Sequence, residues 1–320
     1  MRKVAFVFPG QGSQYAGMGK SLYENFSIAR DVFDSAEEIL KWDIKGLCFD
    51  NKEDKINLTE YTQPAILVTS FAAWKILAEE GVTPEVVAGH SLGEYSAIVA
   101  AGGAAFSEIL PSVQSRGRYM QEAVPKGKGM MAAILGLSKE IVTEVCENAS
   151  GLGVVAPANF NTFDQIVIAG SADAVNKAME LAKEKGAKKI VPLNVSVPSH
   201  TQLMKVSSER FSEVLDGIKF FDIKTPNAPL ITNVDAKIVN LSSDIKGSLN
   251  RQLTNPVRWC ESMSTLINMG YNTFIEVGPG RVLSGLIRKI ARDMDAKIDI
   301  MNVEDADSFN KTLDTIKMAS

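Results

Sequence analysis

Residues 86–103 read VVAGHSLGEYSAIVAAGG and contain, in order, a short apolar run, a turn bounded by two glycines and a stretch of good helix formers. Residues 86–88 predict a short buried strand, and residues 92–101 predict a helix that ends at Gly102. A strand that runs through a tight turn into a helix is the unit of α/β folds with a mostly parallel sheet. This stretch therefore decides the fold class.

The rest of the chain repeats the alternation of buried strand and helix. Residues 4–8 (VAFVF) are a continuous apolar run ended by Pro-Gly, which is typical of a strand buried on both faces of a parallel sheet. Residues 64–80 have helical apolar spacing, and residues 229–232 and 273–277 are further strand candidates. We therefore expect an α/β core with a mostly parallel sheet.

A further helix is expected over residues 107–124, with Ser107 as its N-cap. Pro111 then falls at the fourth helical position. A proline there should remove the first intrahelical hydrogen bond and little else.

The middle of the chain has a different order of elements. Successive patterns predict strand, helix, strand, strand, helix and strand over residues 131–135, 138–149, 154–158, 165–169, 173–185 and 189–195. The order βαββαβ is that of a ferredoxin-like unit. We predict a small ferredoxin-like subdomain at residues 127–196, inserted in a large hydrolase-like catalytic domain made of residues 1–126 and 197–320.

Composition excludes several classes of function. The 320 residues carry a net charge of −4, which gives no electrostatic reason to expect a nucleic-acid partner. The three cysteines, Cys48, Cys146 and Cys260, are far apart and form neither a zinc pattern nor a CxxC pattern, so no metal site is expected. No apolar stretch is long enough for a signal peptide or a bilayer span, and we expect a cytoplasmic protein with no membrane partner.

Residues 89–93 fit the G-x-S-x-G pattern and lie in the setting that this pattern requires, after a strand and before a helix. The sharp turn places the hydroxyl of Ser91 at the carboxyl end of the sheet. The N-terminal N–H groups of the following helix then point to where negative charge develops during acyl transfer. We interpret Ser91 as a nucleophile; the competing interpretation is a glycine-rich turn without chemistry.

A serine nucleophile needs a base, and histidine suits this role near neutral pH. The chain has two histidines, His90 and His200. His90 adjoins Ser91, so its side chain is expected to face the other way, which leaves His200. No acid clearly completes a triad, since neither Asp216 nor Asp222 stands out. A Ser-His dyad whose imidazole is oriented by a carbonyl group is the preferred hypothesis.

The loop over residues 8–14 (FPGQGSQ) follows the first strand and nearly fits a phosphate-binding pattern. Tyr15 occupies the third glycine of G-x-G-x-x-G, and Gln14 occupies the first glycine of the P-loop pattern. A nucleotide site is therefore disfavoured. Hydrolase-like folds use such a loop for an oxyanion donor, which here predicts the N–H groups of Gln11 and Leu92.

Six blocks in this order resemble the malonyl-CoA:acyl carrier protein transacylase family over about residues 4 to 290. They are residues 8–14 (FPGQGSQ), 89–96 (GHSLGEYS), 116–121 (RGRYMQ), 197–200 (VPSH), 252–257 (QLTNPV) and 277–280 (VGPG). The resemblance implies malonyl transfer from malonyl-CoA to the phosphopantetheine arm of acyl carrier protein, for fatty acid synthesis, through a malonyl-serine and without a cofactor.

The resemblance also assigns roles by position. It implies Ser91 as nucleophile, His200 as base and the main-chain carbonyl of Gln252 as the group that orients His200. The residues alone do not choose between Arg116 and Arg118 as the arginine for the malonyl carboxylate; the resemblance implies Arg116. A guanidinium can hold a carboxylate through two parallel hydrogen bonds and so distinguish malonyl from acetyl.

Two alternatives to the transferase stay open at this point. A serine esterase or thioesterase would use the same dyad, and a non-catalytic acyl-binding protein would use the pocket alone. An acidic carrier protein would need a basic docking surface. Two candidate clusters are Lys183, Lys185, Lys188 and Lys189, and Arg281, Arg288 and Lys289; either could be an ordinary solvated face.

Overall fold

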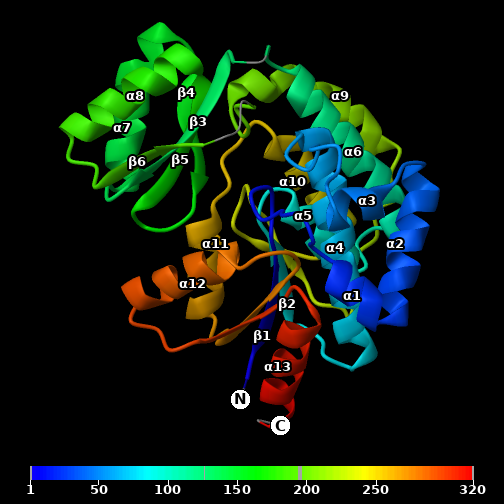
Figure 1. The fold of residues 1–320 in the computed structure, drawn as a ribbon. Helices are drawn as coiled ribbons and strands as arrows, with labels where there is room; N and C mark the ends of the chain where they lie inside the picture. Colours follow the sequence, from blue (N-terminus) through cyan, green and yellow to red (C-terminus); the bar gives the residue numbers. More distant parts are fainter. Residues whose placement is uncertain (1, 126, 194–196, 319–320) are drawn as a thin grey trace.

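A six-stranded sheet runs through the larger part of the protein in the computed structural model, which describes residues 2–125, 127–193 and 197–318 (Figure 1). The strand order is β10-β9-β1-β2-β7-β8, and every neighbouring pair is parallel except β7 and β8. The strands are β1 (Val4–Phe8), β2 (Val86–Gly89), β7 (Leu230–Ile231), β8 (Ile238–Val239), β9 (Thr273–Val277) and β10 (Asp299–Val303). The predicted α/β fold with a mostly parallel sheet is confirmed.

Helices cover both faces of this sheet, as the apolar run of β1 requires. Phe6 and Phe8 face one core, together with residues of α2, α4, α5 and α6, whereas Ala5 and Val7 face a second core formed with α11 and α12. The helices of this part are α1 (Lys20–Asn25), α2 (Ser27–Leu40), α3 (Ile44–Phe49), α4 (Thr59–Glu79), α5 (Gly93–Ala100), α6 (Phe106–Glu122), α9 (Lys205–Asp216), α10 (Ser242–Gln252), α11 (Trp259–Asn268), α12 (Val282–Asp293) and α13 (Ala306–Lys317), with a 3-10 turn at Gln202–Met204. Alternate side chains of one strand thus pack into two layers of helices.

A separate four-stranded antiparallel sheet lies at the upper left of Figure 1 with two helices on its outer face. Its elements follow the predicted order: β3 (Gly129–Leu135), α7 (Lys139–Ala149), a 3-10 turn (Ser150–Leu152), β4 (Val155–Phe160), β5 (Gln165–Ser171), α8 (Ala172–Glu184) and β6 (Lys189–Pro192). Ser138 caps α7 by accepting a hydrogen bond from the N–H of Ile141. The inner face, with Met131 and Val167, lines the cavity described below.

The small sheet is joined to the larger part by more than the chain itself. The N–H of Phe160 donates to the carbonyl of Val257 at 2.9 Å, and the N–H of Val257 donates to the carbonyl of Ala158 at 2.9 Å. Asp164, between β4 and β5, forms an ion pair with Lys289 of α12. The two parts therefore meet along one edge of the small sheet.

Two helix starts expected from the sequence are corrected by the structure. Ser107 is not an N-cap, because α6 begins at Phe106 with Ala105 as its cap, and Pro111 is the sixth helical residue. The helix expected from residue 64 begins at Thr59, because Pro64 is accommodated inside α4. The last strand of the small sheet ends at Pro192; its expected end at residue 195, and the proposed junctions at residues 126 and 196, involve residues outside those described.

Within the described ranges, no helix combines the length and the apolar content needed to cross a bilayer.

Candidate active site

Ser91 lies in the sharp turn between β2 and α5, with a left-handed backbone (φ 51°). The two flanking glycines make this turn possible. A Cβ on Gly89 would lie 1.9 Å from the carbonyl carbon of Gly93, and a Cβ on Gly93 would lie 2.0 Å from the carbonyl oxygen of Phe8. The turn therefore requires glycine on both sides of the serine, because a side chain at either position would collide with the following helix or the neighbouring strand.

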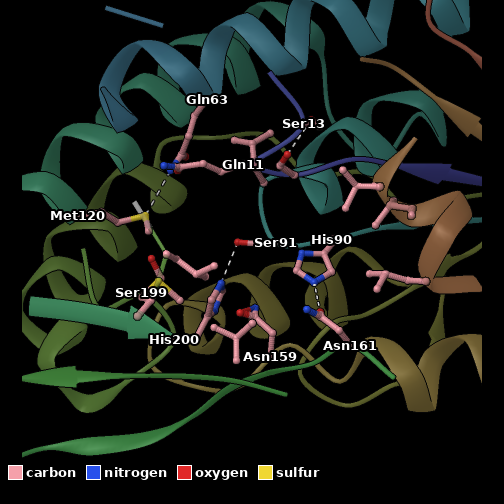
Figure 2. A pocket seen from close by; sticks show the side chains of 18 of the residues that line it. Gln11, Ser13, Gln63, His90, Ser91, Met120, Asn159, Asn161, Ser199 and His200 are labelled. Carbon is pink, nitrogen blue, oxygen red and sulfur yellow. Dashed lines mark hydrogen bonds between the residues drawn. The ribbon is translucent and has the colours of Figure 1, made fainter. Parts of the chain in front are cut away.

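His200 reaches Ser91 across 109 residues of sequence: the serine Oγ donates to Nε2 of the imidazole at 2.8 Å (Figure 2). Nδ1–H donates to the main-chain carbonyl of Gln252 at 2.8 Å, which fixes the tautomer that leaves Nε2 free to accept. The two acids considered from the sequence lie elsewhere. Asp216 pairs with Lys246, and Asp222 accepts from the N–H of Ser242.

The imidazole of His200 is buried, with 3% of its surface exposed. Burial, followed by the nearby charge of Arg116, lowers the pKa of His200 to about 3. The ring is therefore neutral at pH 7, as a base that accepts a proton from a serine must be.

Arg116 comes from α6 and is 1% exposed. Its guanidinium donates to Oε1 of Gln63 (2.8 Å), to Oε1 of Gln252 (2.9 Å) and to Oγ of Ser91 (3.2 Å). Arg118 is exposed and lies over the ring of Tyr119 instead. Of the two arginines that the sequence left open, only Arg116 faces the serine, and Pro111 does not prevent this.

Gln11 and Leu92 both line the cavity in front of Ser91. Gln11 is in the loop after β1. This loop passes close to the turn that holds Ser91, called the elbow below: a Cβ on Gly10 would lie 2.2 Å from the carbonyl oxygen of His90. Leu92 is the N-cap of α5. Within the part of the chain that the structure describes, neither backbone N–H donates to a protein atom, so both remain available to a substrate oxygen.

The expectation that His90 faces away from the site is wrong. His90 lines the same cavity as Ser91, and its Nε2–H donates to Oδ1 of Asn161 at 2.8 Å (Figure 2). The reason is that the residue before the serine is already in the turn, so strand alternation no longer sets its direction. His90 bonds Asn161 and not Ser91, which leaves His200 as the imidazole at the nucleophile.

Sequence reasoning also missed four polar residues around the dyad: Gln63, Glu94, Asn161 and Asn233. Asn233 accepts from the N–H of Ser91 at 2.7 Å and donates to the carbonyl of Gly89 at 2.6 Å. Only Glu94 left a signal in the sequence, because it is the one charged residue in the predicted helix over 92–101. The other three are recognisable only from contacts between distant segments.

The cavity lies between the two parts of the protein and has a volume of about 180 Å³. It is lined by Ser91, His200 and Arg116, by residues of the inner face of the small sheet, and by Val282 and Leu286 of α12. It is smaller than the roughly 300–1,000 Å³ of sites for drug-sized ligands. The arrangement suits attack of a serine on a short acyl group with one polar end.

Comparison with known proteins gives consistent results. The profile of the acyl transferase domain family matches residues 5–312. The malonyl CoA-acyl carrier protein transacylase of Bacillus subtilis is 46% identical over 318 residues, covering 99% of this chain and 98% of that protein. The Escherichia coli K12 protein of the same name is 42% identical over 297 residues, covering 92% and 95%.

Solved structures give the same picture. A malonyl-transacylase determined in complex with a type II polyketide acyl-carrier protein superimposes with a TM-score of 0.93 at 41% identity, covering 98% of this chain and 99% of that chain. The transacylase from Streptococcus pneumoniae gives 0.92 at 44% identity, covering 98% and 100%.

Proposed function

This chain belongs to the acyl transferase domain family, among the malonyl CoA-acyl carrier protein transacylases, and we propose that it transfers malonyl from malonyl-CoA to the phosphopantetheine thiol of acyl carrier protein, supplying fatty acid synthesis. The observation that carries the proposal is the meeting of Ser91, His200 and Arg116 in one cavity. The first two give a nucleophile and its base, and the third gives a partner for the carboxylate that distinguishes malonyl from acetyl.

In the first half-reaction, Ser91 Oγ attacks the thioester carbonyl carbon while its proton moves to Nε2 of His200. The N–H groups of Gln11 and Leu92 hold the resulting oxyanion. When the tetrahedral intermediate collapses, the carbon–sulfur bond breaks, and the CoA thiolate takes the proton from the imidazolium. The products are malonyl-Ser91 and free CoA, with His200 neutral again.

In the second half-reaction, the carrier-protein thiol binds where CoA was and gives its proton to His200. Its sulfur attacks malonyl-Ser91 through the same oxyanion site, and Ser91 leaves with the proton returned by the imidazole. The carbonyl of Gln252 keeps the ring in the required tautomer throughout. The sequence of events is ping-pong.

Arg116 supports the choice of a transferase with malonyl specificity. Its guanidinium is buried and is held by neutral acceptors, so a carboxylate that enters the cavity gains a charge-assisted pair. An acyl group without a carboxylate leaves the arginine without that partner. Holding the far end of the acyl group also keeps the ester carbonyl away from productive water, which favours transfer over hydrolysis.

The test is intact mass after incubation with malonyl-CoA. The protein should gain the mass of one malonyl group, and Ser91→Ala should gain none. Addition of a pantetheine thiol should then move the label to the thiol. Release of free malonate in place of a thioester product would support the esterase alternative, and covalent malonate on the Ser91→Ala variant would contradict the assignment of the nucleophile.

The finer classification of the fold is part of the same proposal. The order βαββαβ and the strand order β4-β5-β3-β6 support a ferredoxin-like subdomain over residues 127–196, inserted in a hydrolase-like domain of residues 1–126 and 197–320. A cytoplasmic location is supported by the three free cysteines.

For the carrier protein we propose the exposed face of α12 around Arg288 as the docking surface. Of the candidate cluster Arg281, Arg288 and Lys289, Arg281 pairs with Glu304 and Lys289 pairs with Asp164, so among the described residues Arg288 is the member without an ion pair. Val282 and Leu286 of this helix line the cavity, so a partner seated on α12 lies beside the entrance. Arg288 is exposed on the same helix. An acidic partner would be attracted to this face and would place its prosthetic arm near Ser91.

A further inference from the structure

Glu94 is a fully buried carboxylate beside the catalytic groups, and the mechanism above does not use it. It lies in the first turn of α5, three residues after Ser91. Its Oε2 accepts from Nε2 of Gln252 at 2.5 Å. Its Oε1 accepts from the backbone N–H of Asn233 at 3.3 Å and from Oγ of Ser248 at 3.4 Å. Among the described residues, all three hydrogen bonds that this carboxylate makes are donated to it.

Gln252 connects Glu94 with Arg116, with the main chain of Ser91 and with the imidazole of His200. Its side-chain Nε2 also donates to the carbonyl of Ser91 at 3.1 Å, and its Oε1 accepts from Arg116 at 2.9 Å. Its main-chain carbonyl accepts from His200. A side-chain amide has one donating end and one accepting end, so the direction of this amide decides whether Arg116 meets an oxygen or an N–H group.

An ionised carboxylate can only accept hydrogen bonds, and for that reason it fixes the direction of the Gln252 amide. The Nε2 end must face Glu94, and the Oε1 end must then face Arg116. A neutral amide at position 94 would present its NH2 group, a donor, either toward the N–H of Asn233 or toward Nε2 of Gln252. In both cases two donors would meet in a buried place, which is unfavourable.

The chain of hydrogen bonds from Glu94 through Gln252 to Arg116 also explains how Arg116 is buried without losing its function. Among the described residues, the guanidinium is held by neutral oxygens and forms no ion pair, and Glu94 is the carboxylate one amide away from it. A carboxylate in direct contact with Arg116 would occupy the guanidinium. Through Gln252, the negative charge of Glu94 partly offsets the buried positive charge while leaving the guanidinium free for a substrate carboxylate.

We propose that Glu94 is a positioning residue that, through Gln252, holds Arg116 in the orientation that selects a carboxylate-bearing acyl group. The inference rests on the proposed function, since it concerns the preference for malonyl over acetyl in the acylation of Ser91. Burial raises the pKa of Glu94 to about 7, and the hydrogen bonds from Gln252 and Asn233 together with the charge of Arg116 oppose that rise. The test is therefore made at pH 8, where the carboxylate is ionised.

The measurement is the rate of acylation of Ser91 by malonyl-CoA and by acetyl-CoA, followed by intact mass, and the quantity compared is the malonyl-to-acetyl ratio. Glu94→Gln should lower this ratio by roughly tenfold to a hundredfold, because the amide of Gln252 or its neighbour is left mispaired. Glu94→Asp keeps the acceptor-only charge at a longer distance, and its ratio should fall between those of wild type and Glu94→Gln.

Glu276→Gln is the matched control. Glu276 is also fully buried, but it accepts from the N–H groups of Leu283 and Ser284 at the start of α12 and does not contact Gln252 or Arg116. Loss of this carboxylate should lower thermal stability and leave the ratio within about twofold of wild type. A general effect of removing a buried charge would instead lower the ratio in both variants, which would overturn the proposal.

A ratio within about twofold of wild type in folded Glu94→Gln would overturn the inference. Should Glu94→Gln fail to fold, Glu94→Asp decides in the same way, since an unchanged ratio in that variant also refutes the role of Glu94. Failure of the proposed function is distinguishable, because the wild-type protein itself would then form no malonyl-Ser91.

Discussion

The unfolding free energy of the protein is expected to fall between pH 7 and pH 5. Replacing His200 with glutamine should make this fall smaller by about 2 kcal/mol. The reason is the environment of the imidazole. His200 is buried and lies near the positive charge of Arg116, and both effects lower the pKa of His200, from an ordinary 6.5 to about 3. The folded protein therefore resists a proton that the unfolded protein accepts readily.

The sign and the size follow from this difference. Above pH 6.5 the ring is neutral in both states, so the stability is fully present. As the pH falls toward 3, the unfolded state is protonated and the folded state is not, and stability is lost. The loss is about 2 kcal/mol at pH 5 and approaches about 5 kcal/mol below pH 3. Glutamine at position 200 does not titrate, so the His200→Gln variant should lack this part of the pH-dependent loss of unfolding free energy.

The assay is urea unfolding followed by tryptophan fluorescence, for wild type and His200→Gln, at pH 7 and pH 5. The quantity of interest is the change in unfolding free energy with pH, compared between the two proteins, because His90 and the carboxylates are common to both and cancel. A difference below about 0.5 kcal/mol, the usual size of an incidental surface effect, would refute the picture of a buried neutral imidazole. It would also remove the physical basis for His200 as the base.

Three further outcomes are expected. Gly93→Ala should destabilise the protein by about 2–3 kcal/mol in thermal or urea unfolding, because its Cβ would meet the carbonyl oxygen of Phe8 at 2.0 Å; unchanged stability would contradict the close packing of the elbow. Arg116→Lys keeps the charge but loses the two-pronged geometry, so acylation by malonyl-CoA should fall by at least about tenfold while acylation by acetyl-CoA stays the same; an equal loss for both would argue against carboxylate recognition. Arg288→Glu should raise the KM for acyl carrier protein several-fold at low salt without altering the malonyl-CoA half-reaction, whereas Lys183→Glu on α8 should leave that KM unchanged; the reverse pattern would move the docking surface to α8.

The strands that were predicted correctly are those whose local residue pattern reflects their burial in the sheet. Continuous apolar runs predicted β1 and β2 because these strands are buried on both faces of a parallel sheet. The edge strand β10 (Asp299–Val303) was not predicted, since it mixes polar and half-buried residues and is paired on one side only. Serine is a residue type favoured at N-caps, but α6 begins one residue before Ser107, at Phe106.

The residues of the site also fall into two groups: some are predictable from a local sequence pattern, and others are defined only by contacts between distant segments. The elbow around Ser91 is local: strand, turn and helix lie within eighteen residues, and the pattern is visible in the sequence. His200 was found because the chain has only two histidines. Gln63 and Asn233 were missed because their roles exist only through contacts with Arg116 and Ser91 that span 53 and 142 residues. A single glutamine or asparagine in a sequence does not indicate which distant residue its side chain contacts.

The two residues joined by the 2.8 Å hydrogen bond, Ser91 and His200, both have a left-handed backbone, with φ of 51° and 62°. Such conformations are unfavourable for residues other than glycine and persist only where the surroundings fix them. Asn233 does this at the serine, by bonding the backbone on both sides of the turn. The carbonyl of Gln252 holds the imidazole of His200, and Gln252 is in turn held by Glu94. The 2.8 Å distance between Ser91 and His200 is therefore maintained by Asn233 and Gln252, which follow Ser91 by 142 and 161 residues. For that reason the five-residue motif by itself is weak support for catalysis, whereas the assembled core is strong support.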